Sequence, residues 1–174
     1  SVDTNSFLGI LRDRTLIDEL DLPTEAQWEY ACRAGTTTYY SDGEAAAPND
    51  GVSLNTGESN TFINVLGRYK YNGGHWWNGS AWVQTAGTVG PTNGTAIVGS
   101  YLPNAWGLYD VHGNVHEWVL DRYAASLTGG VDPVGAAVGG SRVSRGGSWS
   151  HAASYCRSAS RGTCATSYRF NNGG

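Results

Sequence analysis

Apolar residues recur at helical spacing near the start of the chain. Phe7, Ile10 and Leu11 lie at positions i, i+3 and i+4, so the pattern predicts an amphipathic helix over residues 5–14. The apolar residues that follow are expected to continue as a buried connection; they are Leu16, Ile17 and Leu20.

A second helix is predicted from Thr24 to about Gly35. The Thr24 hydroxyl can accept a hydrogen bond from the backbone N–H of Gln27, whose side chain can reach back to complete a capping box. Gly35 stands where the end of a helix favours a residue with positive φ. The expected inward face consists of Trp28, Ala31 and Cys32.

Between residues 36 and 104 the pattern is irregular and rich in turn-forming pairs such as Asp-Gly and Asn-Gly. One of these pairs, at residues 78 and 79, predicts a hairpin over residues 75–83. Further along, residues 141–149 predict a strand that enters a glycine bend, and residues 155–161 alternate enough to predict another strand. No repeat or linker interrupts the pattern, so we expect a single domain over residues 1–174.

Composition agrees with a compact, loop-rich domain of mixed or mostly β structure. Glycine accounts for 25 of 174 residues, and the chain also has seven tryptophans and ten tyrosines. Its glycine share is roughly twice the usual value of about 7%, which disfavours a helical bundle. The aromatic content disfavours a disordered chain.

Charge and cysteine content exclude some functions and leave others open. The net charge is −4 with a single lysine, so no basic stripe could follow a phosphate backbone and nucleic-acid binding is disfavoured. No apolar run approaches the ~20 residues of a membrane helix, and the polar opening shows no signal peptide. Three cysteines without a C-x-x-C pair leave the compartment open, with the cell surface or secretion favoured.

Two pairs of residues invite a catalytic or transition-metal interpretation. His112 and His116 would share one face of a helix, but Gly113 and Asn114 between them disfavour a helix and no third ligand is evident. Cys156 could be a nucleophile with His151 as its base, although five residues apart on a predicted strand they need not face each other.

The segment from Asp110 to Glu117 is a candidate site for a hard cation. It is a turn bounded by two carboxylates, and its glycine leaves main-chain carbonyls free to act as ligands. Oxygen ligands of this kind suit Ca²⁺. Asp and Glu beside Asn-Gly are also ordinary turn residues, so both interpretations stay open.

Four sequence blocks occur in order and resemble the formylglycine-generating enzyme, or sulfatase-modifying-factor, family. The resemblance extends over essentially the whole chain and implies an α+β fold, a variant of the C-type lectin fold with two helices and small twisted antiparallel sheets. The blocks are LPTEAQWEYACRAG (22–35), NAWGLYDVHGNVHEW (104–118), RGGSW (145–149) and RSASR (157–161).

The resemblance implies a structural Ca²⁺ and argues against the family's chemistry. The family's oxidase needs two cysteines after the Gly-Gly-Ser motif, and this chain has His151 where the first belongs and Cys156 near the second. One thiolate cannot form a two-thiolate site for a soft metal. The resemblance also suggests a Cys32–Cys156 disulfide. The Ca²⁺ ligands it implies are Asp110, Gly113, Val115 and Glu117.

Members of this fold that lack the cysteines include the variable proteins of diversity-generating retroelements. In these proteins the segment after the Gly-Gly-Ser-Trp turn is rewritten at asparagine codons, which cannot become codons for Glu, Lys, Gln, Met or Trp. None of those five residues occurs from Ser150 to Asn172. The resemblance therefore implies a variable region over residues 150–172.

The expected function is non-enzymatic binding of a ligand, with a protein as the expected partner, through an adaptable surface of small polar and aromatic residues. The alternative is a formylglycine-generating-type oxidase or an inactive remnant of one. A plain polar, turn-rich end of the domain is the simplest interpretation of the same residues. The candidate binding residues are Ser150, His151, Ser154, Tyr155, Ser160, Gly162, Thr163, Tyr168, Phe170, Asn171 and Asn172.

Overall fold

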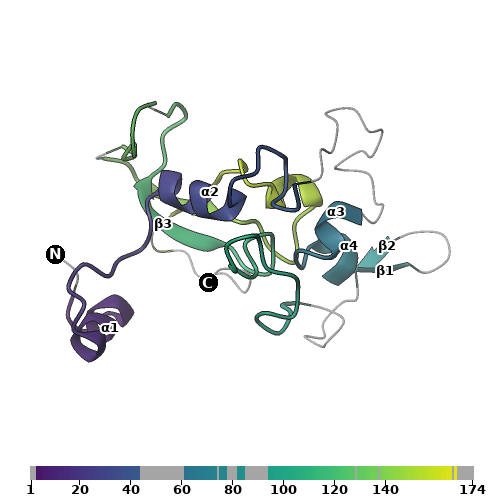
Figure 1. The fold of residues 1–174 in the computed structure, drawn as a ribbon, viewed down its shortest axis with the longest axis horizontal. Helices are drawn as coiled ribbons and strands as arrows, with labels where there is room; N and C mark the ends of the chain where they lie inside the picture. The colour runs from purple at the N-terminus through teal and green to yellow at the C-terminus, as the bar shows by residue number, and fades with distance from the viewer. Residues whose placement is uncertain are drawn as a thin grey trace.

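The computed structural model describes residues 3–43, 61–73, 75–77, 82–84, 94–127, 129–136, 138–165 and 167. The elements are α1 (Phe7–Thr15), α2 (Glu25–Arg33), α3 (Thr61–Asn64), α4 (Lys70–Gly73), β1 (His75–Trp77), β2 (Trp82–Gln84), β3 (Glu117–Arg122), β4 (Ser141–Arg145), the 3-10 helix η1 (Ala153–Cys156) and β5 (Gly162–Ala165). Helix α2 lies beside one small antiparallel sheet and helices α3 and α4 lie beside a second, with long connections between the elements (Figure 1).

Helix α2 forms as its local sequence predicts. The Thr24 hydroxyl accepts from the backbone N–H of Gln27, and the Gln27 side chain accepts from the backbone N–H of Thr24, which completes the capping box. The helix ends at Ala34 with φ 46°, and Gly35 follows with φ 91°. The strand pairing of the predicted hairpin is also confirmed, since β1 pairs with β2 and Trp77 lies opposite Trp82, whereas the predicted turn at residues 78 and 79 lies outside the described residues.

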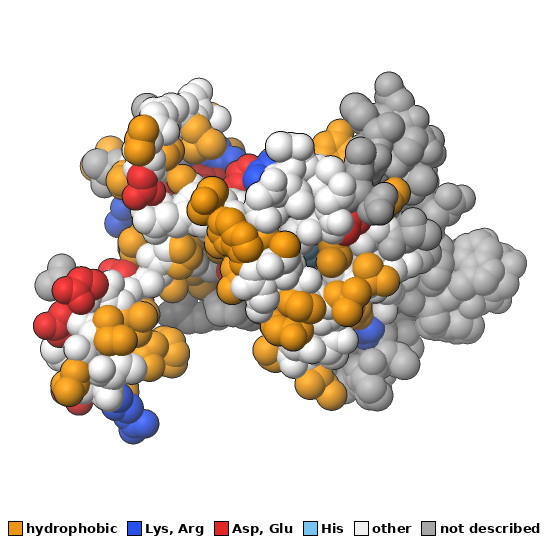
Figure 2. All heavy atoms as spheres, in the orientation of Figure 1, with side chains coloured by type: hydrophobic (Ala, Val, Ile, Leu, Met, Phe, Trp, Pro, Cys, Tyr) orange, Lys and Arg blue, Asp and Glu red, His pale blue; other side chains and the backbone are white. Residues whose placement is uncertain are grey.

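Helix α1 forms close to its predicted range, but its apolar face is not buried. Phe7 is 77% exposed, Leu16 is 87% exposed, and none of the residues of α1 is buried. The expectation of a buried connection after this helix is therefore wrong at Leu16 and Ile17. Figure 1 shows α1 apart from the rest of the molecule, and Figure 2 shows apolar side chains gathered on its surface.

The main sheet has the order β3-β4-β5 and is antiparallel throughout. Its register pairs Glu117 with Arg145 and Val143 with Thr163. The predicted strand and glycine bend at 141–149 are confirmed by β4 and by the positive φ of Gly146 and Gly147. The predicted strand over 155–161 is wrong, because η1 and a turn occupy that segment and the strand begins only at residue 162.

Two apolar clusters hold the domain together. One lies between α2 and the main sheet, and the other joins the region of α3 to η1. The first contains Trp28, Cys32, Val111, Val119 and Val143; the second contains Tyr40, Ile63, Leu66, Tyr69, Ala153 and Cys156.

All three cysteines are free and buried, so the expected Cys32–Cys156 disulfide is wrong. Cys32 belongs to the cluster under α2, whereas Cys156 belongs to the cluster beside α3. The Cys32 thiol instead lies 3.5 Å from the Ser158 hydroxyl. Burial raises the pKa of both thiols to about 12, so they remain protonated.

Candidate functional site

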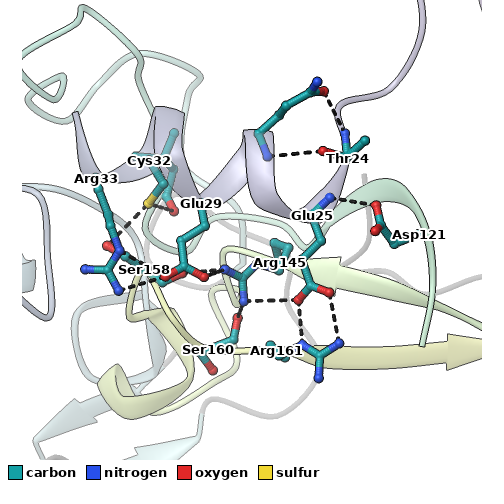
Figure 3. Close-up of polar contacts among 12 residues, drawn as sticks. Thr24, Glu25, Glu29, Cys32, Arg33, Asp121, Arg145, Ser158, Ser160 and Arg161 are labelled. Carbon is teal, nitrogen blue, oxygen red and sulfur yellow. Dashed lines mark hydrogen bonds and ion pairs between the residues drawn. The ribbon is translucent and has the colours of Figure 1, made fainter. Parts of the chain in front are cut away.

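A buried network of ion pairs attaches the C-terminal segment, residues 145–161, to helix α2 (Figure 3). Arg145, at the end of β4, is fully buried and forms ion pairs with Glu25 and Glu29 on α2. Arg161, just before β5, forms two hydrogen bonds to the Glu25 carboxylate, at 2.6 and 2.9 Å. Because both arginines meet carboxylates of one helix, the segment between them has fixed ends.

Arg145 also holds the backbone of that segment. One of its nitrogens donates to the carbonyl of Ser160 at 2.6 Å, and another donates to the carbonyl of Ser158 at 2.7 Å. The backbone N–H of Ser158 in turn donates to the carbonyl of Tyr39. The two terminal nitrogens of the guanidinium and both carbonyls are thereby satisfied, whereas Nε of Arg145 is buried without a hydrogen-bond partner among the described residues.

The glycine bend after β4 places η1 directly against it. Gly147 has φ 73°, and a Cβ at this position would lie 2.6 Å from the Cys156 sulfur and 2.8 Å from the Tyr155 carbonyl oxygen. Only glycine fits both the backbone conformation and this close approach. The bend therefore determines where the first candidate binding residues stand.

The described candidate binding residues fall into two groups. The first group surrounds η1 and consists of Ser150, His151, Ser154 and Tyr155. The second lies before and within the edge strand β5 and consists of Ser160, Gly162 and Thr163. The remaining candidates lie outside the described residues; they are Tyr168, Phe170, Asn171 and Asn172.

Exposure alternates with burial along both groups. Tyr155 is 56% exposed, while its neighbour Cys156 is fully buried. Thr163 is exposed beside the buried Cys164. Gly162 differs from the others, because a Cβ there would lie 2.4 Å from the Ser144 hydroxyl oxygen. A side chain at residue 162 thus requires Ser144 to move.

Two imidazoles meet at the base of the η1 group. The rings of His116 and His151 have centres 4.8 Å apart and planes at 71°. Nδ1 of His151 lies 2.6 Å from the Ser148 hydroxyl, and the Tyr155 ring centre lies 5.4 Å from that of His151. Burial lowers the pKa of both histidines, that of His116 to about 4, so both rings are neutral at pH 7.

His116 has a buried ring nitrogen without a partner. Burial and His151 lower the pKa of the imidazole, and the backbone of Arg145 raises it. Nδ1 is buried and has no hydrogen-bond partner within the described part of the chain. A buried polar atom without a partner is uncommon in a folded protein and needs an explanation.

The residues of the candidate Ca²⁺ site form a tight turn at the surface of the sheet. Asp110 has φ 59°, and one of its carboxylate oxygens accepts from the backbone N–H of Gly99, whereas Oδ1 is buried and has no partner among the described residues. Glu117 accepts from the Trp28 indole N–H at 2.8 Å. Burial and the nearby Asp110 raise the pKa of Glu117, while the Trp28 hydrogen bond lowers it.

The backbone of this turn requires glycine at residue 113. Gly113 has φ 96°, and a Cβ would lie 2.1 Å from the carbonyl oxygen of Arg68. Its N–H donates to the carbonyl of Gly146, and Asn114 follows with φ 60°. Val115 lies between Asn114 and the start of β3, so the four candidate ligands occupy one continuous turn.

The other chemical candidates have structural roles. His112 is buried; its Nε2 accepts from the backbone N–H of Ser41, so its Nδ1 donates to the carbonyl of Cys156. It therefore has no free nitrogen for a metal. The Cys156 thiol faces the carbonyls of Ser148 and Ala152 rather than His151, which excludes the nucleophile–base pair. No group of three His, Cys, Asp or Glu side chains suited to a metal occurs among the described residues.

Sequence reasoning missed two features that depend on distant residues. The contact between His116 and His151 joins positions 35 apart, and no local pattern indicates it. The ion network under α2 joins Glu25 to residues 145 and 161. A cavity of about 570 Å³ beside this network, lined in part by Tyr30, Leu127 and Val134, was also not predicted.

The small antiparallel sheets, short helices and long connections of the described residues define a fold of the C-type lectin-like class. The chain belongs to the sulfatase-modifying factor enzyme 1-like domain family, whose model matches residues 13–174. The family and fold expected from the sequence are thus confirmed. Within the described residues, no helix is long and apolar enough to cross a membrane.

Several solved structures are similar to this chain. The variable protein 1 of Treponema denticola has a similar structure, with a TM-score of 0.62 and 31% identity, over 88% of this chain and 45% of that chain. PvdO from Pseudomonas aeruginosa shares the fold at 24% identity and a TM-score of 0.65, over 98% of this chain and 56% of that chain.

Curated relatives include formylglycine-generating enzymes. The one from Thermomonospora curvata is 37% identical over 155 residues, which is 83% of this chain and 44% of the relative. The one from Streptomyces coelicolor is 39% identical over 141 residues, 78% of this chain and 38% of the relative. The chain thus spans less than half the length of these two relatives.

Proposed function

We propose that this domain is a non-enzymatic binding module whose C-terminal surface is diversified by a retroelement and recognises a protein ligand at the cell surface or after secretion. The surface consists of the two described groups around η1 and β5 together with the candidates beyond residue 167. The similarity to the Treponema denticola variable protein 1 supports this function.

The observation that carries the proposal is the separation of exposed and buried positions. In the η1 group, Tyr155 faces water while Ala153 and Cys156 fill the core. Tyrosine supplies rigid amphipathic contact area, and serine and threonine supply adaptable hydrogen bonds. A surface built this way can change its ligand without changing the residues that hold the fold.

A genomic comparison tests the diversification. We expect a near-copy of the 3′ coding region beside a reverse-transcriptase gene, with AAC codons at the candidate positions. Isolates of one strain should then differ at positions such as 155, 160 and 163 and agree at the buried positions 153, 156 and 158. A gene without such a copy, and identical across isolates, would contradict the proposal.

The second candidate function is a formylglycine-generating-type oxidase or its remnant, and the curated relatives favour it. The cysteine chemistry does not, because Cys156 is fully buried with a raised pKa and His151 stands nearby rather than a second thiol. Incubating the protein with Cu⁺, oxygen and a cysteine-containing peptide distinguishes the two functions. Formation of an aldehyde on the peptide, lost in C156A, would establish the oxidase.

We also propose that the turn from Asp110 to Glu117 binds a structural Ca²⁺. The carboxylates of Asp110 and Glu117 and the carbonyls of Gly113 and Val115 would be its ligands. Two observations fit this proposal: Asp110 Oδ1 is buried without a partner among the described residues, and the pKa of Glu117 is raised. A cation would satisfy the first and offset the second. The ion would fasten the turn that supports β3.

Removing Ca²⁺ should therefore destabilise the domain. A ligand present at 100 times its dissociation constant adds about 2.7 kcal/mol to the free energy of unfolding. We expect the thermal midpoint to fall when EDTA replaces Ca²⁺, and D110N to lose this response. The exposed Asp18 gives the matched control, because D18N should respond like the parent protein. A midpoint that is insensitive to Ca²⁺ would rule the site out.

A further inference from the structure

We propose that His116 and His151 together bind one divalent transition-metal ion of borderline softness, such as Zn²⁺ or Cu²⁺, at the base of the η1 group. This site differs from the His112–His116 pair considered from the sequence, since His112 uses both ring nitrogens within the core. It is also separate from the oxygen ligands of the Asp110–Glu117 turn. The inference does not depend on diversification of the surface.

The distance between the rings fits a shared ion. With metal–nitrogen bonds of about 2.0–2.1 Å, two imidazoles on one ion have ring centres about 4.5 Å apart at a right angle and about 5.2 Å apart at the tetrahedral angle. The observed separation is 4.8 Å, and the planes are inclined at 71°. The separation of the rings therefore suits one shared ion, provided that Nδ1 of His116 and Nε2 of His151 turn toward it.

Each ring also has a nitrogen that could bind the ion. Among the described residues, Nδ1 of His116 is buried and has no hydrogen-bond partner. His151 contacts the Ser148 hydroxyl through Nδ1, which leaves Nε2 for the ion. Such outer contacts fix the tautomer and orientation of the ligand.

The environment suits a transition metal better than Ca²⁺ or a soft Cu⁺ ion. Neutral imidazole is a preferred ligand of Zn²⁺ and Cu²⁺, whereas Ca²⁺ prefers oxygen ligands. The nearest thiol, that of Cys156, faces main-chain carbonyls and does not join the rings. Two protein ligands leave coordination positions for water, and half-buried His151 lies beside the exposed Tyr155. A carboxylate or imidazole of a bound protein could occupy those positions.

Titration of the full chain with Zn²⁺ in excess Ca²⁺ tests the site, because Ca²⁺ occupies carboxylate sites first. We expect one Zn²⁺ per chain, with affinity at least tenfold weaker in H116Q and in H151Q. Replacing the positioning residue in S148A should weaken binding by about tenfold. H75Q is the matched control, since it removes another histidine of the chain and should leave the affinity unchanged.

Electron paramagnetic resonance with Cu²⁺ gives a second readout. The spectrum of the parent protein should show two nitrogen ligands, and that of H151Q should show one. H151Q keeps the proposal testable if H116Q does not fold, because His151 is only half-buried. Absence of Zn²⁺ binding, an affinity unchanged in H151Q, or a Cu²⁺ spectrum without two nitrogens would overturn the proposal.

Discussion

At the scale of single residues, neighbours in the C-terminal segment differ in what they contribute. Ser158 is fully buried against the Cys32 thiol, whereas Ser160 is half-buried and bonds to Arg145 through its carbonyl. A larger side chain therefore fits at residue 160 but not at residue 158. The two serines form a natural pair for comparison.

We predict that S160Y is tolerated and that S158Y is not. Overpacking a filled interior typically costs about 1–3 kcal/mol, while a surface substitution usually changes stability by less than about 0.5 kcal/mol. Chemical denaturation of both variants beside the parent protein measures the difference. Equal losses of unfolding free energy in the two variants would contradict a framework with free outer positions.

The thiols give a second prediction at this scale. Because burial raises the pKa of Cys32 and Cys156 to about 12, neither forms a thiolate at neutral pH. We expect a thiol reagent to label none of the three cysteines in the native protein within minutes and all three in denaturant. Fewer than three labelled thiols after unfolding would indicate a disulfide.

At the scale of elements, local and distant interactions determine different parts of the fold. Helix α2 could be predicted because Thr24 and Gln27 form its cap within one turn. The segment 155–161 could not, because η1 is held by packing of Ala153 and Cys156 on Tyr40 and Tyr69, more than 80 residues earlier. The alternation of apolar and polar residues along the sequence gives no information about that contact.

The candidate site divides in the same way. The Asp110–Glu117 turn was identified because its proposed ligands are close in sequence. The pairing of His116 with His151 was not, because β3 and the bend after β4 bring the two rings together across the sheet. The sequence can single out His116 as a candidate ligand without indicating that His151 is its neighbour.

The glycine bend gives the prediction for elements. G147A should cost at least about 2 kcal/mol and displace η1, since the new methyl group would meet the Cys156 sulfur and the φ of 73° disfavours alanine. Among the described residues, Gly129 has no atom other than its chain neighbours within 4 Å of an added Cβ and no positive φ, so G129A is the control and should be nearly neutral. Denaturant midpoints of both variants provide the measurement.

At the scale of the whole molecule, α1 contributes little to the body. None of its residues is buried, and the side-chain hydrogen bonds of Arg12 to described residues are to Leu20 and Asp21 in the following connection. An amphipathic pattern thus predicted the helix correctly but not its environment, because periodicity says nothing about which surface a helix meets.

We predict that removing residues 1–19 leaves the thermal midpoint of the remaining domain nearly unchanged. In the same assay T24A, which removes the cap of α2, should lower the free energy of unfolding by about 1 kcal/mol. A truncated chain less stable than T24A would mean that α1 stabilises the body after all.

The two bonds from Arg145 to the carbonyls of Ser158 and Ser160 have a consequence for how this segment can evolve. Every residue has the same backbone carbonyl group, so these hydrogen bonds do not depend on the side chains of the residues that they hold. One arginine thereby fixes the path of the backbone, while the side chain at an outward position such as residue 160 can vary. Substitutions can therefore accumulate at such positions without changing the fold.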